Sequence, residues 1–395
     1  MSDGTANTAD AEGNQRVSRR RFLKYAAATG GGALVGSALG YYLGQVSASA
    51  TQQSASLSLI DALAKAYGLS TDEVSGALQE KSFTGYINYT LDQATAIKNA
   101  FQDVYPFLTE NVVSLPSVQI GSRFSSEAAQ GVRNASLLDL SDAGIMTNLV
   151  KSNLLLNYTP PNSQSVLSQV KSPPYWYGIG LEYNSIVWNT NLVSDAQAPK
   201  TWWDLADPVW NGKLGMSTLR GGSQLLPNMM WRYGLETQYG RRFWDALATN
   251  NVKIYVGGTT TIRALVAGEI SVMVDSVDDS NIPLWQSGAP IKWVYPNPTP
   301  AFFLLEAITK NAPSPNAAKF FLNWILSQSG QLTVQRVLGV APVRPDVPDI
   351  RPILTQPWFN PPKPPSGVWF PPSWDWYLQN LPALQDEYKA VFHIS

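Results

Sequence analysis

The sequence predicts an α/β protein. From about residue 84 onward, short apolar runs alternate with longer segments of helical periodicity, and this alternation is typical of a sheet covered by helices. The chain has 395 residues, of which 44% are hydrophobic. It is therefore long and apolar enough to bury the core of one large domain or of two medium ones.

Composition and charge exclude several classes of protein. The formal net charge is −1, and no cluster of Lys and Arg follows residue 24, so nucleic acid is not an expected partner. The chain has no cysteine and one histidine, His393. Disulfides, thiolate metal sites, cysteine nucleophiles and catalytic triads that depend on histidine are therefore excluded.

The N-terminus predicts export. Residues 18–24 read SRRRFLK and precede a weakly apolar run at 25–46 that is rich in Ala and Gly. Arg19 and Arg20 match the pair of a twin-arginine signal, and the residues after them fill the other consensus positions. The sequence ASA at 48–50 suits a signal peptidase, but the apolar run is also long enough to remain as an uncleaved anchor. In either case the chain from residue 51 onward lies on the extracellular or periplasmic side of the membrane.

The first part of the exported chain alternates strand and helix patterns after a Ser-rich stalk and a short helix. The expected strands occupy 84–91, 112–122 and 135–142, and the expected helices occupy 92–107, 123–132 and 144–158. The helix at 92–107 has apolar residues at helical spacing. Its expected inward face is Ala96, Ile97, Ala100, Phe101 and Val104.

A second α/β block starts near residue 177. We expect a helix after Gly222 and another at 259–269, which leads into an apolar strand at 270–274. That strand ends in an acidic loop. The carboxylates of the loop are Asp275, Asp278 and Asp279.

The chain then returns to the first block through residues 289–298. Residues 314–331 have the pattern of one amphipathic helix, and a short helix is expected at 381–392. Between them lies a Pro- and Trp-rich segment that is too aromatic for a disordered linker. We expect it to pack as an extended strap, and a tail that docks a partner is the alternative.

Five segments, in order, resemble the extracellular solute-binding proteins of ATP-binding cassette (ABC) importers. They are APKTWWDLADPVWNGKLGM, LVAGE, APIKWVYP, SPNAAKFFLNWILSQSGQ and GVAPVRPDV. The resemblance is to the type II periplasmic-binding-protein group, which includes binders of ferric ion, thiamine, phosphonates and sugar phosphates. It implies two α/β lobes with a ligand cleft between them, joined by crossing strands at a hinge.

The resemblance also implies domain boundaries and partners. We expect the signal at 1–50, the stalk at 51–83, a first lobe from 84–180 plus about 292–395, and a second lobe from 181–291. The implied function is the capture of a small-molecule solute and its delivery to permease subunits of an ABC transporter in the membrane. A monomer without catalytic residues, cofactor or bound metal is implied.

The iron ligands of the family's ferric-ion binders are missing from this sequence. Those proteins use a His in the first loop, a Glu after the second strand and an adjacent Tyr pair, and such oxygen ligands suit Fe(III). Here the first loop has no His, Arg123 falls at the Glu position, and Val277 and Asp278 fall at the Tyr pair. A positive side chain would repel a trivalent cation. Iron held in the family's manner is therefore not expected.

Three predicted helix starts on cleft loops offer donors to an anionic group. Backbone N–H groups at a helix N-terminus attract anions, although capping by Ser or Thr is the ordinary role of such residues. The expected ligand contacts are Ser122, Arg123, Gly222, Ser223, Thr259 and Thr260.

The aspartates and one aromatic residue complete the expected ligand site. By the resemblance, Asp275 falls where the family has a ligand-contacting side chain, and Asp278 replaces a tyrosine. Tyr183 lies at the first crossing between lobes, where a ring can stack on a sugar or a cation. With Arg123, these residues favour an anionic or zwitterionic solute, such as a phosphonate or a sugar phosphate. A cationic solute (thiamine, a polyamine or Fe(III)) fits if Arg123 points elsewhere.

Two other classes of function are alternatives. An exported hydrolase could use carboxylates as acid and base, but the acids here cluster on one loop and no hydrolase signature is present. A surface adhesion module is suggested by the aromatic C-terminal segment. We expect a binding protein and not an enzyme.

Overall fold

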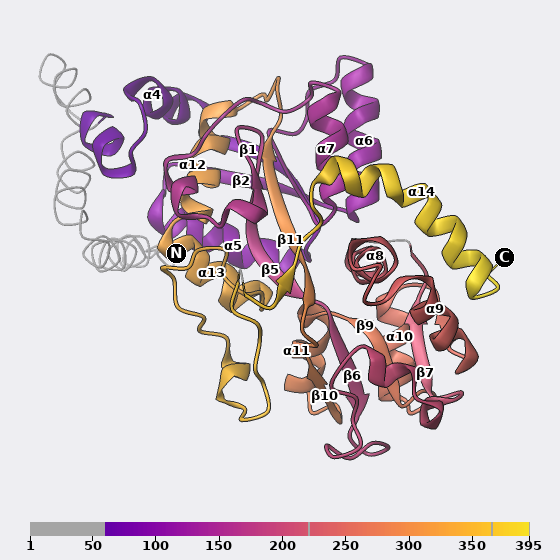
Figure 1. Cartoon of the computed structure of the whole chain (residues 1–395). Helices are drawn as coiled ribbons and strands as arrows, with labels where there is room; N and C mark the ends of the chain where they lie inside the picture. Colours follow the sequence, from indigo (N-terminus) through magenta and orange to yellow (C-terminus); the bar gives the residue numbers. More distant parts are fainter. Residues whose placement is uncertain (1–59, 220–221, 365, 395) are drawn as a thin grey trace, which may run out of the picture.

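The computed structural model describes residues 60–219, 222–364 and 366–394, and it shows two lobes, each built on its own sheet (Figure 1). The predicted twin-arginine pair, Arg19 and Arg20, and the predicted cleavage site lie outside the described residues. Within the described part of the chain, no helix is both long and apolar enough to cross a membrane.

The first lobe contains a seven-stranded mixed sheet in the order β2-β1-β3-β11-β5-β4, with β12 paired to β11. Strands β1, β2 and β3 are parallel, and β11 runs antiparallel to β3 and β5. The strands are β1 (Ser82–Ile87), β2 (Thr109–Ser114), β3 (Leu137–Leu140), β4 (Lys171–Ser172), β5 (Trp176–Tyr183), β11 (Thr299–Ile308) and β12 (Val368–Trp369). The helices around this sheet are α4 (Thr71–Glu80), α5 (Leu91–Val104), α6 (Ser117–Ala129), α7 (Ala143–Lys151), α12 (Pro315–Ile325) and α13 (Gln328–Leu338).

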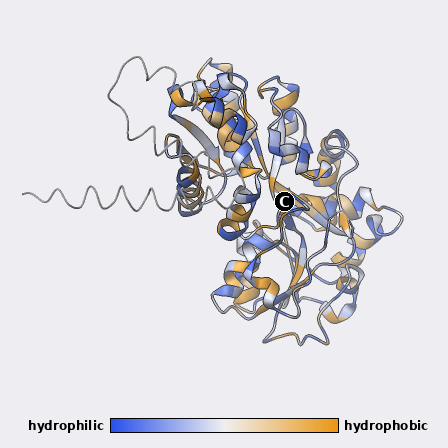
Figure 2. Cartoon of the chain, turned by 90° about the vertical axis from the view of Figure 1, so that its left-hand side faces the viewer, coloured by the Kyte–Doolittle hydropathy of each residue, from blue (hydrophilic) through white to orange (hydrophobic). Residues whose placement is uncertain are grey.

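The second lobe contains a five-stranded sheet in the order β10-β6-β9-β7-β8. Its strands are β6 (Ser185–Asn189), β7 (Leu214–Ser217), β8 (Lys253–Tyr255), β9 (Val272–Ser276) and β10 (Ile291–Val294). Its helices are α8 (Gly222–Met229), α9 (Gly240–Thr249), α10 (Gly258–Val266) and α11 (Asp278–Gln286). Figure 2 shows hydrophobic and hydrophilic stripes along the helices, as expected for helices that cover a sheet with one face.

The chain crosses between the lobes twice, and these crossings confirm the predicted two-lobed architecture. Strand β5 of the first sheet continues through Asn184 into β6 of the second, and residues 295–298 join β10 to β11. Strands β5 and β6 on either side of the first crossing are buried, as is β11 after the second. Two short connections of this kind are what a hinge between lobes requires.

Two predicted helices differ from the structure. Helix α5 carries the predicted Ile97 and Phe101 in its buried face, but Ala96 is exposed and Ala94 is buried instead. The helix expected at 314–331 is divided into α12 and α13, because Ser327 caps a new helix by accepting from the Gly330 N–H at 3.2 Å. A Cβ at Gly330 would stand 2.1 Å from the Trp324 carbonyl oxygen, so this close approach between the helices requires glycine.

The C-terminal segment packs against both lobes. The rings of Trp358 and Phe359 meet Trp293 of β10 at centroid distances of 4.9 and 5.7 Å, so residues 340–373 are a packed strap. Helix α14 (Trp374–Val391) follows it and is longer than the predicted helix at 381–392. Its residues Leu384 and Tyr388 are buried in the core of the second lobe, although we expected the chain up to 395 to belong to the first lobe.

Candidate functional site

A polar cavity of about 180 Å³ lies between the two lobes. The first lobe contributes Ser141, which follows β3, and β11 contributes Phe302. All the other lining residues come from the second lobe, from the starts of α8, α10 and α11 and from β9. They are Gln224, Gly258, Thr259, Met273, Asp275, Ser276, Val277, Asp279 and Ser280.

Asp275 is the most deeply buried carboxylate of the cavity lining. It lies near the end of β9, and none of its surface is exposed to solvent. The backbone N–H of Ser217, on β7, donates to Oδ2 of Asp275 at 3.1 Å. Burial nevertheless raises the pKa of Asp275 to about 7, since removing a carboxylate from water favours its neutral form. Asp275 therefore changes charge near neutral pH.

Asp279 forms an acidic pair with Glu182. The backbone N–H of Asp279 donates to Oε2 of Glu182 at 3.0 Å, and Glu182 is buried on β5 at the hinge. Asp279 is exposed at the wall of the cavity, and desolvation by the protein atoms around its carboxyl group raises its pKa. The pKa of Glu182 is raised first by burial and then by the nearby charge of Asp279. Burial and the closeness of the two groups thus both favour the neutral form of Glu182.

Ser141 is fixed at the cavity by a hydrogen-bond network in the first lobe. The side-chain amide of Asn88 donates to the hydroxyl oxygens of Ser117 and Ser141, at 2.9 Å in each case. The backbone N–H of Ser141 also donates to the Ser117 hydroxyl at 3.0 Å. These contacts join the ends of β1 and β3 to the start of α6.

The structure places Ser122 and Arg123 within helix α6 and not among the residues that line the cavity. Helix α6 begins at Ser117, so both residues lie inside the helix, where they have no free N–H groups to offer. The Ser122 hydroxyl donates to the Val118 carbonyl. Arg123 donates through Nε to Glu127 at 2.8 Å, its side chain is 44% exposed, and neither residue lines the cavity.

Asp278 and Tyr183 also lie away from the cavity. Asp278 is completely buried and receives a hydrogen bond from Nη1 of Arg351 at 2.8 Å and another from the Tyr295 hydroxyl. Tyr183 is buried with its ring edge toward Tyr295, at a centroid distance of 5.8 Å. Both residues belong to the contact between the strap and the hinge and not to the lining of the cavity.

The predicted helix starts of the second lobe are positioned at the cavity in part. Gly258 and Thr259, at the start of α10, line it, whereas the Thr260 hydroxyl donates to the Val256 carbonyl at 3.1 Å and does not line it. Helix α8 begins at Gly222. The predicted side-chain contacts of residues 222 and 223 lie outside what the structure describes.

Sequence reasoning missed Ser141, Gln224 and Glu182. Ser141 directly follows a strand, and ligands in open α/β sheets bind beyond the carboxyl ends of strands, so its position was a usable signal. Glu182 is the only charged residue in a strand that is otherwise apolar, WYGIGLEY, which is also a signal. Gln224 had none, because nothing local distinguishes it from an ordinary helix residue.

The ionisable side chains that line the cavity are acidic. Asp275 and Asp279 line it, and no Lys, Arg, His or Tyr does so among the described residues. The described chain also contains no group of three or more His, Cys, Asp and Glu placed to hold a metal ion. The cavity thus offers carboxylates, hydroxyl groups, an amide and one aromatic ring.

Comparison with known proteins gives both a family and a fold. The family model described as "Bacterial extracellular solute-binding protein" matches residues 134–375. A curated relative, the Fe(3+)-binding periplasmic protein of Serratia marcescens, is 25% identical over 158 residues. That match covers 38% of this chain, and the chain spans only 44% of the relative's length.

Solved structures of periplasmic binding proteins share the two-lobed fold. Iron-bound HitA from Pseudomonas aeruginosa superposes with a TM-score of 0.64 and 19% identity, covering 78% of this chain and 99% of HitA. AfuA from Actinobacillus pleuropneumoniae, with exogenous fructose-6-phosphate bound, gives a TM-score of 0.63 and 17% identity, covering 80% of this chain and 100% of AfuA. At these identities the likeness establishes the type II periplasmic-binding-protein fold.

Proposed function

This chain belongs to the family of bacterial extracellular solute-binding proteins, and we propose that it captures a small, positively charged polar solute for an ABC importer. The solute is held between the lobes and handed to permease subunits in the membrane. The protein acts as a monomer and is exported by the twin-arginine route. As a member of a binding-protein family, it returns its ligand unchanged.

The charge of the cavity carries the choice of solute class. Asp275 and Asp279 line the cavity, and no basic residue of the described chain lines it beside them. An ammonium or similar cation would attract the charged forms of both carboxyl groups and so favour their ionisation. The hydroxyl groups of Ser141, Thr259 and Ser280 would bind polar groups of the same solute.

The expected preference for an anionic solute loses its main support. Arg123 was to hold the anionic end, but it is paired with Glu127 on the surface of α6. The donors that could still bind an anionic group are the free backbone N–H groups at the N-termini of α8 and α10. A zwitterionic solute fits if its anionic end reaches these helix starts.

Ferric iron is the second candidate solute. It is favoured by the named ligands of the relatives, since both the Serratia protein and HitA are described with iron. Carboxylate oxygens are suitable ligands for Fe(III), and the cavity supplies two of them. Because no tyrosine or histidine of the described chain lines the cavity, iron would need a ligand set other than the family's.

Mass spectrometry of the solute released from purified, unfolded protein tests the proposal. We expect an organic molecule with an amine or another cationic group, which binds again in calorimetry and is recovered unchanged after incubation. Release of a solute with only negative charge would overturn the cationic class. Conversion of the solute during incubation would overturn the assignment as a binding protein.

A further inference from the structure

Helix α14 packs against both lobes, and its contact area on each lobe is called a seat below. Figure 1 shows it running from α7 in the first lobe to α9 in the second. The helix spans Trp374–Val391, whereas the family match ends at residue 375. It is thus an addition to the part of the chain that identifies the family.

The first turn of α14 contacts the first lobe, although Tyr377 beside it is also buried against the second. The Trp374 ring lies 5.6 Å from that of Phe303 and 6.3 Å from that of Trp176. Asp375 forms an ion pair with Lys151 of α7 at 2.6 Å, but both side chains are more than half exposed. Exposed pairs of this kind contribute little to stability, so the aromatic contact is the main one.

The last turns of α14 are held more firmly by the second lobe. The Tyr388 hydroxyl donates to the Ser217 carbonyl at 2.9 Å, and the Tyr388 ring packs against Trp244. Glu387 accepts hydrogen bonds from Arg232 and from the Tyr233 hydroxyl, at 2.7 Å in each case. This end of the helix is therefore fixed to the lobe that supplies most of the cavity.

A proline interrupts α14 between its two seats. Pro382 lies inside the helix, where it has no N–H to donate to the carbonyl four residues earlier, and its ring crowds that turn. A helix bends more easily at such a point. The seat of Trp374 precedes Pro382 and the seat of Tyr388 follows it.

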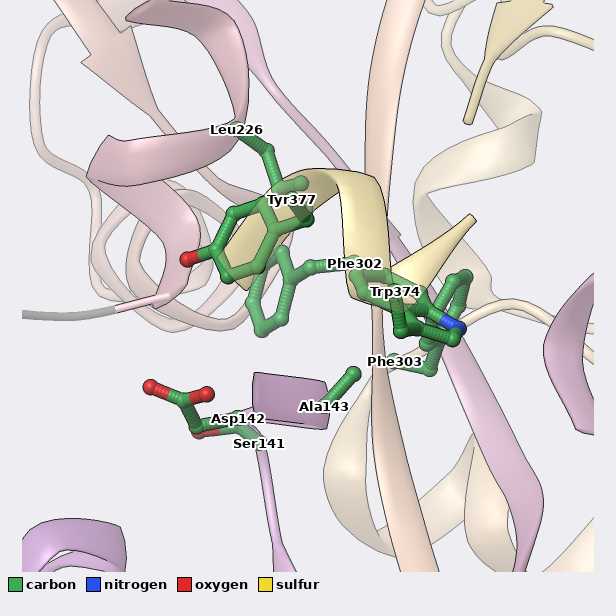
Figure 3. A pocket seen from close by; sticks show the side chains of 8 residues that line it. All are labelled: Ser141, Asp142, Ala143, Leu226, Phe302, Phe303, Trp374 and Tyr377. Atoms are coloured by element: carbon green, nitrogen blue, oxygen red, sulfur yellow. The ribbon is translucent and has the colours of Figure 1, made fainter. Parts of the chain in front are cut away.

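The first turn of α14 lies where the two lobes contact each other. Figure 3 shows Trp374 and Tyr377 of α14 around a small cavity with Leu226 of α8, Phe302 of β11 and Asp142 at the start of α7. Side chains from both lobes thus meet α14 at one point. A change in the angle between the lobes must alter the packing there.

We propose that α14 is a strut, that is, a helix that connects the two lobes and limits how far they can separate. Bending at Pro382 lets the lobes move relative to each other while both ends of α14 keep their contacts. A straight helix with both ends fixed would oppose hinge motion, whereas a helix with a joint permits it within a limited range. The inference rests on the contacts of α14 alone and holds for any solute.

Distances between spin labels in the unliganded protein test the strut. The chain has no cysteine, so Asp103→Cys on α5 and Arg263→Cys on α10, both exposed, report the separation of the lobes. In this background, Trp374→Ala removes the seat on the first lobe, and we expect a broader distribution that extends to longer distances. Pro382→Ala restores an N–H and stiffens the helix, and we expect a narrower distribution.

Trp203→Ala is the matched control, because the Trp203 ring contacts Tyr239 and Phe243 within the second lobe. It is expected to leave the distribution as in the parent. If Trp374→Ala fails to fold, Pro382→Ala tests the proposal alone. This variant is expected to fold because alanine is a more favourable helix residue than proline. Distributions for Trp374→Ala and Pro382→Ala that superpose on the parent would overturn the strut.

Discussion

Asp278 and Arg351 form a completely buried ion pair, with Nη1 of Arg351 2.8 Å from Oδ2 of Asp278. The pair joins the start of α11 in the second lobe to the C-terminal strap, and Asp349 also pairs with Arg351 at 2.9 Å. Removing one partner of a buried pair leaves the other charge in a medium that cannot solvate it. The strap is therefore fixed to the second lobe by a contact that is costly to break.

Arg351→Met should accordingly destabilise the protein by about 3–5 kcal/mol, because it leaves Asp278 without its cation. Thermal and denaturant unfolding measure the effect. Arg241→Met is the control, since Arg241 pairs with Asp245 while both are about half exposed, and a change of ~0–1 kcal/mol is expected. The double variant Asp278→Asn with Arg351→Met should recover part of the loss. If Arg351→Met lowered the free energy of unfolding no more than Arg241→Met does, the buried ion pair would not be the stabilising contact described above.

Three carboxyl groups in the first lobe predict a pH-dependent stability. Glu110, Asp139 and Glu306 are buried on β2, β3 and β11, and none of their six oxygens has a hydrogen-bond partner within the described chain. Burial raises the pKa of Glu110 and of Asp139 to about 8, and it raises that of Glu306 well above its usual range. The charges of all three groups raise the pKa of the buried Tyr89 hydroxyl further, and the charge of Lys98 opposes the rise in the pKa of Glu110.

These groups fold in their neutral form, and this fixes the sign of the effect. Their folded-state pKa values lie above the ordinary value of 4.5 for a Glu. The contribution of these groups to the free energy of unfolding is therefore fully present below about pH 4.5 and is lost as the pH rises through about 8. Glu306→Gln, which stays neutral, should raise the melting temperature more at pH 9 than at pH 5. Glu269→Gln, at an exposed position, should change it equally little at both. An equal effect of Glu306→Gln at the two pH values would show that Glu306 is not protonated in the fold.

Export gives a prediction from the sequence alone. Arg19→Lys combined with Arg20→Lys should prevent export of the folded protein in a host with a twin-arginine pathway, since the pathway recognises the pair. Arg16→Lys, a change at a basic residue outside the pair, is the control and should leave export intact. Cell fractionation and immunoblotting measure both variants. Unimpaired export of the double variant would remove the assignment of the signal.

The sequence predicted the fold because the fold depends on repeated local patterns. Apolar strands alternate with amphipathic helices along the whole chain, and the order of the family's segments implies how the lobes connect. Helix boundaries were less predictable. The last helix was expected at 381–392, but α14 begins earlier, at Trp374. Tertiary packing at both lobes outweighs the cost of an internal proline.

The site was predicted less well because its geometry depends on partners that are distant in sequence. Asp275 and Thr259 line the cavity as expected. Asp278 does not, because its partner Arg351 lies 73 residues later in the chain, and no local pattern reveals that contact. Arg123 was misplaced because α6 begins well before it, at Ser117. An error in one helix start thus moved a charged residue out of the site.

The acidity of Asp275 links solute binding to pH. In the free protein its pKa is raised to about 7 by burial, so about half of the molecules carry a charged Asp275 at that pH. A cationic solute binds the charged form, and its affinity should therefore rise as the pH increases from about 6 to about 8, on either side of that pKa. Losing one charged hydrogen bond in a closed cleft costs about 1.5–3 kcal/mol, which corresponds to a loss of affinity of at least about tenfold.

Asp275→Asn should therefore weaken binding of the released solute by at least about tenfold and remove the rise with pH, as measured by calorimetry. Arg123→Ala and Asp245→Asn, which change charges outside the cavity, should leave both affinity and pH dependence as in the parent. The amide introduced by Asp275→Asn has the shape of the carboxyl group and stays uncharged, so the melting temperature of the unliganded protein should not fall. If affinity instead declines as the pH rises, the neutral acid is the binding form, and the solute is an anion or a neutral polyol rather than a cation.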